Sequence, residues 1–198
     1  MKHVKQSKLD LFIDLVKKYH NTLDLISNKG LETLDLKIQE AMIYVTGINQ
    51  DSPFEKTILD IGSGMGLPGI VLAIALPDFE ITLSERRQKR ATFLQITKST
   101  LELTNVNVFK GDIQHMPNGE YRYITALAVG SFSYLYSVSK HLHAPKITFL
   151  SRKGENWLEE VDELEHSCNM PVNAEKVADL SSHGSLVRLD APGGMFCR

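Results

Sequence analysis

The sequence predicts an α/β fold built on a doubly wound, mostly parallel sheet of seven strands, with an antiparallel last strand. Three observations support this fold class. From residue 57 onward, short apolar segments alternate with helical ones. A glycine-rich turn joins the first of these segments to a helix. The C-terminal part offers two strand candidates separated by a short polar turn, which is typical of a closing hairpin.

The expected strands are short runs rich in apolar and β-branched residues. They cover residues 57–61, 80–84, 106–110, 123–128, 146–151, 173–179 and 185–190. Helical patterns follow the first, second, fourth and fifth strands, at residues 68–76, up to 101, 131–141 and 155–168. Parallel neighbours need such crossover helices, whereas the last two strands are joined by a tight turn.

The first fifty residues predict helices placed ahead of the sheet. We expect Ser7 to cap a first helix and a second helix to cover residues 31–45, after a break at 28–30. Residues 1–50 are therefore expected to form a helical appendage packed on a main domain of residues 51–198. Such an appendage either covers the substrate side as a lid or contributes only packing.

Composition limits the classes of function. The 198 residues suit one domain, and a net charge of −2 gives no overall support for nucleic-acid binding. No apolar run reaches the roughly 18 residues of a membrane helix, and no signal peptide is evident, so we expect a cytoplasmic protein. Cys168 and Cys197 are expected to be free thiols. His141 and His143 lack cysteine or carboxylate partners in sequence, so no metal site is predicted.

The glycine-rich turn is the most informative segment, and it reads Leu-Asp-Ile-Gly-Ser-Gly-Met-Gly-Leu-Pro-Gly at residues 59–69. It joins a strand end to a helix start, where open α/β sheets bind ligands. Residues 64–69 fit the dinucleotide pattern GxGxxG, but Asp60 favours S-adenosylmethionine. A carboxylate there can pair with the methionine ammonium and would repel a pyrophosphate. The candidate residues for the methionine half are Asp60, Gly62, Gly64, Gly66 and Leu67.

Two further strand ends predict contacts with a nucleoside. Glu85 ends the second strand and can accept hydrogen bonds from both ribose hydroxyls. Asp112, Ile113 and Gln114 follow the third strand and can reach the edge of an adenine. These positions fit S-adenosylmethionine and NAD equally well, so they indicate a nucleoside and nothing finer.

With these residues in view, the chain resembles the RsmG family (glucose-inhibited division protein B), guanine-N7 methyltransferases of 16S ribosomal RNA. The resemblance rests on the loop at residues 60–70 and on four shorter matches: Lys89-Arg90, Phe93-Leu94, Leu103-x-Asn105-Val106 and Lys153-Gly154. It implies a Rossmann-like class I methyltransferase fold, S-adenosylmethionine as cofactor and the small ribosomal subunit as partner. It also implies cofactor contacts at Gly62, Leu67, Ile113 and Gln114, with Lys153 near the substrate.

The chain departs from the family pattern at the end of the fourth strand. The family has an arginine followed by alanine there, whereas this chain has Leu127 and Ala128. Arg122 replaces an acidic residue usual on the same strand, and the N-terminal Asn-Leu-Thr pattern survives only loosely at residues 25–27. These departures concern the substrate and the activity more than cofactor binding.

The motifs that are missing bear on the acceptor. Methylation of an exocyclic amine usually uses an Asn/Asp-Pro-Pro-aromatic loop after the fourth strand, and residues 126–129 do not resemble it. Carbon methylation of a pyrimidine needs a cysteine nucleophile, and none lies in that region. Guanine N7 has an exposed lone pair and needs no general base, so the sequence is compatible with that acceptor.

Basic and aromatic side chains supply the candidate RNA contacts. The best candidate patch for phosphate is Arg86, Arg87, Lys89, Arg90 and Lys98, to which Arg152 and Lys153 would add from the fifth strand. An ordinary solvated helix face is the alternative. Aromatic residues at 132, 134 and 136 can stack on a flipped base, but aromatics at such spacing are more often split between core and surface, which favours a packing role.

Three other functions stay open at this point. The same fold can methylate a small molecule or a protein. A degenerate, non-catalytic relative that binds RNA or a partner is suggested by Leu127. An NAD-dependent oxidoreductase rests on residues 64–69 alone. We expect a monomer that contacts ribosomal RNA and neither a membrane nor a metal.

Overall fold

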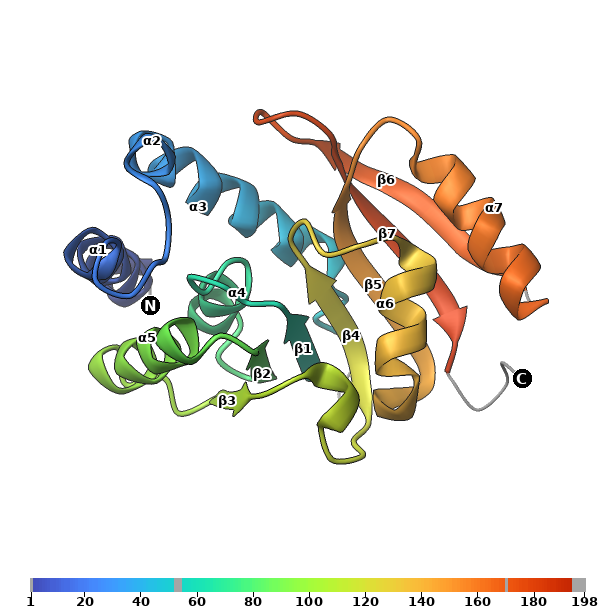
Figure 1. The fold of residues 1–198 in the computed structure, drawn as a ribbon, viewed down its shortest axis with the longest axis horizontal. Coiled ribbons are helices and arrows are strands. Elements are labelled where there is room, and N and C mark those ends of the chain that lie inside the picture. The colour runs from blue at the N-terminus through green and yellow to red at the C-terminus, as the bar shows by residue number, and fades with distance from the viewer. Residues whose placement is uncertain (1, 52–54, 170, 194–198) are drawn as a thin grey trace.

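The computed structural model describes residues 2–51, 55–169 and 171–193. Seven strands form one sheet in the order β3-β2-β1-β4-β5-β7-β6 (Figure 1). Strands β1 to β5 run parallel where they are neighbours, and β7 is antiparallel to both β5 and β6. The predicted fold class is confirmed. The strands are β1 (Thr57–Ile61), β2 (Glu80–Glu85), β3 (Val106–Lys110), β4 (Tyr121–Ala126), β5 (His143–Lys153), β6 (Asn173–Asp179) and β7 (Ser185–Pro192).

Strand bounds at β4 differ from the prediction. The strand was expected at residues 123–128 and instead ends at Ala126. The apolar run continues beyond that point, but the backbone of Ala128 turns into the left-handed region with φ 58°. A strand cannot continue through that conformation. The segment after Ala126 therefore leaves the sheet as a loop that leads to the next helix.

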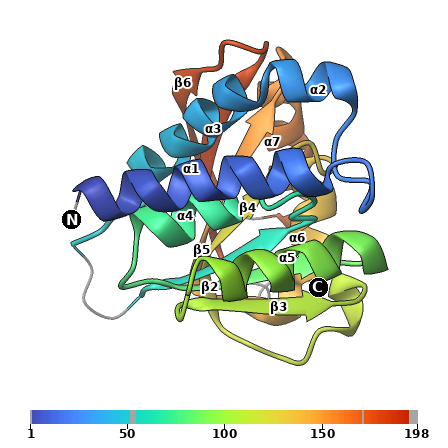
Figure 2. The ribbon, with the colours of Figure 1, turned by 90° about the vertical axis from the view of Figure 1, so that its left-hand side faces the viewer.

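Helices cover both faces of the sheet in two layers (Figures 1 and 2). Adjacent side chains of β1 point to opposite faces of the sheet, so Ile58 packs in the apolar cluster on one face and Leu59 in the cluster on the other. One face carries α1 (Lys2–Tyr19), α3 (Leu34–Ile43), α4 (Gly69–Ala75) and α5 (Gln88–Thr100). The other carries α6 (Phe132–Ser139) and α7 (Trp157–Cys168). The short elements are α2 (Asn28–Glu32) and the 3-10 turns Tyr44–Gly47, Ile113–His115 and Lys140–Leu142.

The N-terminal helices share the core of the sheet instead of forming a separate layer of their own. Phe12 and Val16 on α1, Leu34 on α3 and Tyr44 after it are all buried in the cluster that contains Ile58. Burying such large apolar side chains contributes on the order of 2 kcal/mol each. Figure 2 shows α1 lying across α4 and α5, so these helices are part of the packing that holds the glycine turn.

Two expectations for the N-terminal segment are wrong. Ser7 lies inside α1, where its hydroxyl donates to the carbonyl of Val4, so it does not cap the helix. The expected break at residues 28–30 is the short helix α2, with Ser27 as its cap. The hydroxyl of Ser27 accepts from the Gly30 N–H at 3.2 Å, which satisfies a free donor at the helix start.

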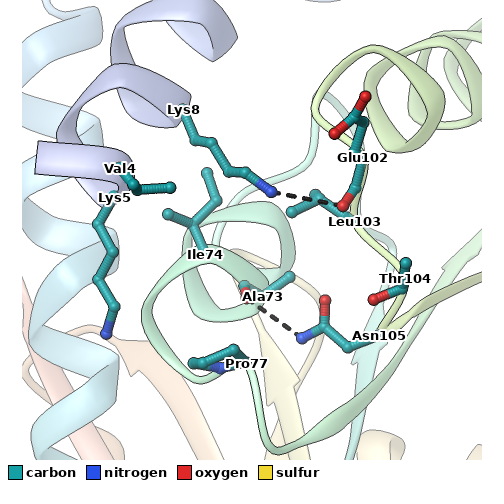
Figure 3. Close-up of a pocket in the computed structure, with 10 residues that line it drawn as sticks. All are labelled: Val4, Lys5, Lys8, Ala73, Ile74, Pro77, Glu102, Leu103, Thr104 and Asn105. Carbon is teal, nitrogen blue, oxygen red and sulfur yellow. Dashed lines mark hydrogen bonds between the residues drawn. The ribbon is translucent and has the colours of Figure 1, made fainter. Parts of the chain in front are cut away.

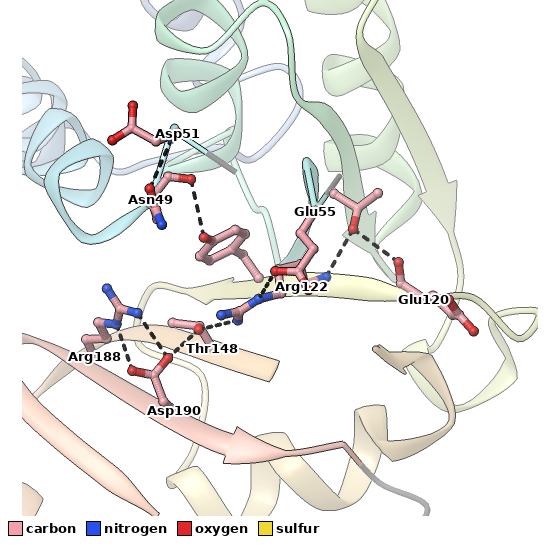
Figure 4. A network of polar contacts seen from close by, with 10 residues as sticks. Asn49, Asp51, Glu55, Glu120, Arg122, Thr148, Arg188 and Asp190 are labelled. Atoms are coloured by element: carbon pink, nitrogen blue, oxygen red, sulfur yellow. Dashed lines mark hydrogen bonds and ion pairs between the residues drawn. The ribbon is translucent and has the colours of Figure 1, made fainter. Parts of the chain in front are cut away.

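A polar network ties strands together at the sheet edge opposite to the glycine turn (Figure 4). Arg122 on β4 pairs with Glu55 at 2.9 Å and donates to the Thr148 hydroxyl on β5. Thr148 donates in turn to Asp190 on β7, which Arg188 contacts at 3.0 Å. Every charge in this chain of contacts has an opposite charge or a hydroxyl beside it. Arg122, which stands where the family pattern has an acidic residue, therefore helps to hold β4 and β5 together.

Membrane and metal features are missing from the part of the chain described above. None of its helices is long and apolar enough to cross a membrane. Its histidine, cysteine and carboxylate side chains nowhere gather in a group of three or more that could hold a metal ion. Cys168 is the last residue of α7 and is partly exposed, whereas Cys197 lies outside the described residues, so the expectation of two free thiols stays a prediction.

Candidate functional site

A cleft of about 380 Å³ opens at the carboxyl ends of the central parallel strands. Its walls come from the turn after β1, the end of β2, the segment after β3, the loop after β4 and the start of α6. Open α/β sheets bind ligands at this edge, where the strand order reverses. The lining residues are Ile61, Gly62, Ser84, Glu85, Arg86, Arg87, Arg90, Gly111, Asp112, Ile113, Leu127, Ala128, Val129 and Tyr134.

The turn after β1 needs glycine at three positions. Gly62, Gly64 and Gly66 have φ values of 69°, 57° and 100°, which residues with a side chain rarely adopt. The turn is held to the neighbouring strand because the N–H groups of Gly62 and Ser63 both donate to the Ser84 carbonyl, at 2.9 and 3.0 Å. Gly62 lines the cleft, whereas Gly64 and Gly66 shape the turn behind it.

Close approach of α4 to the sheet explains a fourth glycine. A Cβ on Gly69 would lie 2.2 Å from the Leu83 side chain and 2.7 Å from the Asp60 carboxylate. Only glycine lets the helix begin directly against β1 and β2. Leu67 is buried at 3% exposure and packs under the turn, outside the cleft wall. The glycine pattern therefore fixes the backbone geometry of the turn.

The Glu85 carboxylate lies at the floor of the cleft and is 5% exposed. One oxygen accepts from the Gly64 N–H at 2.9 Å, and the other accepts from the Arg87 N–H at 2.7 Å. These two bonds join the turn after β1 to the start of α5. Charged acceptors form the stronger class of hydrogen bond, so Glu85 holds both backbones in place while it faces the cleft.

Asp60 lies behind the turn and is fully buried. The Thr125 hydroxyl donates to its Oδ1 at 2.8 Å, and its Oδ2 has no hydrogen-bond partner. Burial raises the pKa of this carboxyl to about 6. In this conformation the turn separates the carboxylate from the cleft, so its pairing with a cofactor ammonium stays a prediction.

The segment after β3 supplies the far wall of the cleft. Asp112 accepts a hydrogen bond from the Gln114 N–H at 3.0 Å and thereby caps the 3-10 turn that follows. Asp112 and Ile113 line the cleft, whereas the exposed Gln114 does not. This part of the predicted adenine site is thus assembled from Asp112 and Ile113.

Three arginines of the predicted basic patch line the cleft at the start of α5. Arg86 and Arg87 are exposed on its rim. Arg90 is partly covered, because its Nε donates to the Asp24 carbonyl at 3.0 Å. That contact connects the loop after α1 to the cleft. Lys89 and Lys98 lie on the same helix but do not line the cleft.

Lys153 lies behind the loop that follows β4. It is 4% exposed, and its ammonium contacts the Glu160 carboxylate at 2.7 Å and the Gly130 carbonyl at 2.9 Å. The same ammonium lies over the Phe132 ring, 4.2 Å from its centroid. Burial lowers the pKa of this lysine. The structure therefore brings Lys153 next to the cleft wall and not to its surface.

The comparisons with known proteins identify the family. The family model described as GidB, rRNA small subunit methyltransferase G, matches residues 5–185. The chain belongs to this family. It is 35% identical to the Ribosomal RNA small subunit methyltransferase G of Helicobacter pylori over 154 residues, 77% of this chain and 84% of that protein. It is 30% identical to the protein of the same name from Desulfotalea psychrophila over 164 residues, 81% of this chain and 75% of that protein.

Solved structures agree with this family at the level of the fold. A mutant of MtNAS, solved in complex with S-adenosylmethionine, superposes on 96% of this chain and 76% of its own, with a TM-score of 0.62. Its sequence identity is 13%, so the similarity concerns the fold alone. The predicted Rossmann-like class I methyltransferase architecture is thereby confirmed.

Leu127 stands where the sequence pattern of the methyltransferase G family leads us to expect an arginine. Leu127 lines the cleft and also a small cavity of about 40 Å³ on its other side. Tyr44 and Arg152 line that small cavity too. The guanidinium of Arg152 is held by the Ser182 carbonyl at 2.6 Å and by the His183 carbonyl at 2.8 Å. The segment after β4 thus places the apolar side chain of Leu127 in the cleft wall. The guanidinium of Arg152 lies behind it, held by two backbone carbonyls.

The aromatic cluster is divided as the helical period requires. Phe132 and Tyr136 are buried, which confirms their packing role, whereas Tyr134 is 50% exposed and lines the cleft. The sequence grouped Tyr134 with Phe132 and Tyr136 as stacking candidates, and the structure separates it from them by its exposure. Helical periodicity alone does not single out Tyr134, because Val138, one turn further along the same side of α6, is buried.

A second cavity, of about 280 Å³, lies away from the cleft, between the start of α1, the end of α4 and residues 102–105 (Figure 3). Polar side chains that line this cavity donate hydrogen bonds to backbone carbonyls. The ammonium of Lys5 donates to Ala75 at 2.7 Å, and the amide of Asn105 donates to Ala73 at 3.2 Å. These bonds satisfy carbonyls at the end of α4, so the cavity belongs to helix packing.

Proposed function

We propose that this protein transfers a methyl group from S-adenosylmethionine to N7 of a guanine in 16S ribosomal RNA. One observation carries the proposal: a glycine turn bonded to an acidic residue on the next strand, at the ligand-binding edge, in a member of the methyltransferase G family. We expect a monomer that acts on ribosomal RNA or the small subunit in the cytoplasm.

The cleft fits the proposed cofactor in size and in chemistry. Its volume of about 380 Å³ lies within the range of small-ligand sites, roughly 300–1,000 Å³. Gly62 would face the methionine half, with Gly64, Gly66 and Leu67 shaping the turn and Asp60 behind it. Glu85 would accept from the ribose hydroxyls. Asp112, Ile113 and the neighbouring Gln114 would flank the adenine.

The proposed acceptor needs no general base in the cleft. S-adenosylmethionine supplies an electrophilic methyl group on a sulfonium. Guanine N7 presents a lone pair that needs no deprotonation, so the protein has only to align the two atoms and exclude water. Among the described residues that line the cleft, none is a histidine or a lysine. The walls formed by Leu127 and Val129 would keep the reacting atoms away from water.

Arginines on the rim supply the proposed contact with RNA. Arg86 and Arg87 are exposed beside the cleft, and Arg90 lies between them and the turn. Guanidinium groups bind phosphate in a bidentate manner and without regard to sequence. A chain with a net charge of −2 would thus bind RNA through this one local patch. Lys153 would act indirectly, through the loop that it holds.

Methyl transfer to defined acceptors tests the proposal. Purified protein would be incubated with tritiated S-adenosylmethionine and small ribosomal subunits, large subunits or a metabolite extract. Label in small-subunit RNA, located at guanine N7 by cleavage after borohydride and aniline treatment, is the expected result. Label only in metabolites or protein would support a different acceptor on the same fold and would overturn the RNA assignment.

Cofactor binding is tested separately by calorimetric titration with S-adenosylhomocysteine, with NADH as control. Binding of the first compound alone is expected. If neither compound bound, the chain would be a non-catalytic relative that keeps the fold, an alternative motivated by Leu127 in place of an arginine. NADH binding would restore the oxidoreductase hypothesis.

A further inference from the structure

Tyr134 places an aromatic side chain in the wall of the cleft. It is 50% exposed, whereas the neighbouring Phe132 and Tyr136 are 0% and 3% exposed. It is also the only aromatic side chain among the described residues that line the cleft. The other lining groups are arginines, carboxylates, backbone and small aliphatic side chains. An exposed aromatic ring in a cleft lined otherwise by charged and aliphatic groups is a candidate site for stacking.

The position of the Tyr134 ring is built into the loop before α6. Gly130 has φ 57°, and a Cβ at this position would lie 2.5 Å from Cδ1 of the Tyr134 ring. Any other residue at 130 would therefore displace the ring. The Ser131 hydroxyl accepts from the Tyr134 N–H at 3.2 Å and begins the helix that carries the ring. Two local features thus place the ring where it is.

The same loop is anchored from behind by an ion pair. The Lys153 ammonium donates to the Gly130 carbonyl at 2.9 Å, and the Glu160 carboxylate accepts from the Phe132 N–H at 3.1 Å. Lys153 and Glu160 contact each other at 2.7 Å. The pair therefore holds the backbone on both sides of Ser131. Since the Lys153 side chain is only 2% exposed, water cannot easily replace these contacts.

We propose that Tyr134 is a stacking platform for a purine ring in this cleft, and that the Lys153–Glu160 pair is its positioning device. The inference rests on the proposed function, which brings two purines to the cleft: the adenine of the cofactor and the guanine acceptor. Every base has a π-face, and stacking on an aromatic side chain is a general way to hold one. The nearby Arg86 and Arg87 guanidinium groups would hold the charged backbone that accompanies such a base.

Two substitutions of Tyr134 separate stacking from other roles. Tyr134→Phe keeps the ring and removes the hydroxyl, whereas Tyr134→Leu keeps apolar volume and removes the flat face. We expect Tyr134→Phe to stay within about twofold of the wild type and Tyr134→Leu to lose about fivefold or more in purine binding. Leu158→Ala serves as control, because Leu158 is 60% exposed on α7 and does not line the cleft.

Two measurements identify which purine is stacked. A rise in the Kd of S-adenosylhomocysteine in Tyr134→Leu, measured by calorimetry, would identify the adenine. An unchanged Kd with a rise in the KM for small subunits at saturating S-adenosylmethionine would identify the acceptor base. Equal loss in Tyr134→Phe and Tyr134→Leu, or no loss in either measurement, would overturn the proposal. Failure of the wild type to bind S-adenosylhomocysteine would instead concern the proposed function.

The positioning role of Lys153 is tested on the Tyr134→Leu background. Lys153→Met alone is expected to reduce binding of the same purine as Tyr134→Leu does. If the lysine acts through the ring, adding Lys153→Met to Tyr134→Leu causes no further loss of purine binding, although thermal stability falls in both backgrounds. Additive losses in binding would overturn the positioning role and leave Lys153 with a purely structural one.

Discussion

The Glu85 carboxylate and the Gly64 N–H, 21 residues apart in sequence, lie 2.9 Å from each other across the floor of the cleft. The second carboxylate oxygen accepts from the Arg87 N–H at 2.7 Å. One side chain thus joins the glycine turn to the helix that carries the basic patch. A residue expected to bind a ribose also organises the walls around that ribose.

Glu85→Gln tests this double role. A carboxamide has one accepting oxygen, so its NH₂ group would face either the Gly64 or the Arg87 N–H, and one of these partly buried donors would lose its acceptor. Losing a charged hydrogen bond costs about 1.5–3 kcal/mol. We expect the affinity for S-adenosylhomocysteine to fall about tenfold or more by calorimetry. Glu120→Gln, at an exposed position before β4, is the matched control and should bind normally.

Burial of Asp60 predicts a specific dependence of stability on pH. Its pKa is raised from 3.8 to about 6, first by burial, so folding favours the protonated form. A raised carboxyl pKa makes the stabilising contribution complete below about pH 3.8, and it is lost as pH rises through about 6. The loss amounts to about 3 kcal/mol over the whole window.

Asp60→Asn removes that titration. Between about pH 4.5 and pH 7.5, the wild type should lose about 2 kcal/mol of its free energy of unfolding relative to the variant. Urea unfolding of both proteins at the two pH values measures the difference, in which the titration of other groups cancels. A difference that stays constant with pH would show that the Asp60 pKa is not raised.

The features that the sequence predicted depend on local patterns, whereas those that it missed depend on contacts between distant residues or on a local change of backbone conformation. The bounds of β1, the glycine turn and the place of Glu85 at the end of β2 follow from periodicity and from a spacing within one βαβ unit, so the sequence predicted these positions. Lys153 was expected near the substrate, but its side chain meets Glu160, a partner on α7 that the spacing of residues does not reveal. The end of β4 was misplaced because the left-handed backbone of Ala128 interrupts an apolar run.

The arginine rim predicts how binding to RNA depends on salt. Replacing Arg86 and Arg87 together with Ala should raise the KM for small subunits and reduce the slope of log affinity against log salt by about 1–2. The Kd of S-adenosylhomocysteine should change little, because these side chains are exposed on the rim. Lys146→Ala, an exposed cation near the opposite edge of the sheet, should leave the slope unchanged. Equal slopes in the two variants would assign the rim to ordinary solvation.

Leu127→Arg tests whether the departure at the end of β4 has impaired catalysis. Leu127 shares the small cavity of about 40 Å³ with Arg152, which two carbonyls already hold in place. A second guanidinium there would share the one carboxylate that lines the cavity, Glu40, with Ser182, whose N–H and hydroxyl donate to it at 2.7 and 2.6 Å, and it would lie beside the Arg152 guanidinium. Repulsion and desolvation should therefore lower the melting temperature by several degrees, at a cost of about 1–3 kcal/mol. We expect methyl transfer to small subunits to stay equal or fall. A gain in transfer by Leu127→Arg, with an inactive wild type, would show that the natural chain has lost the chemistry of its family.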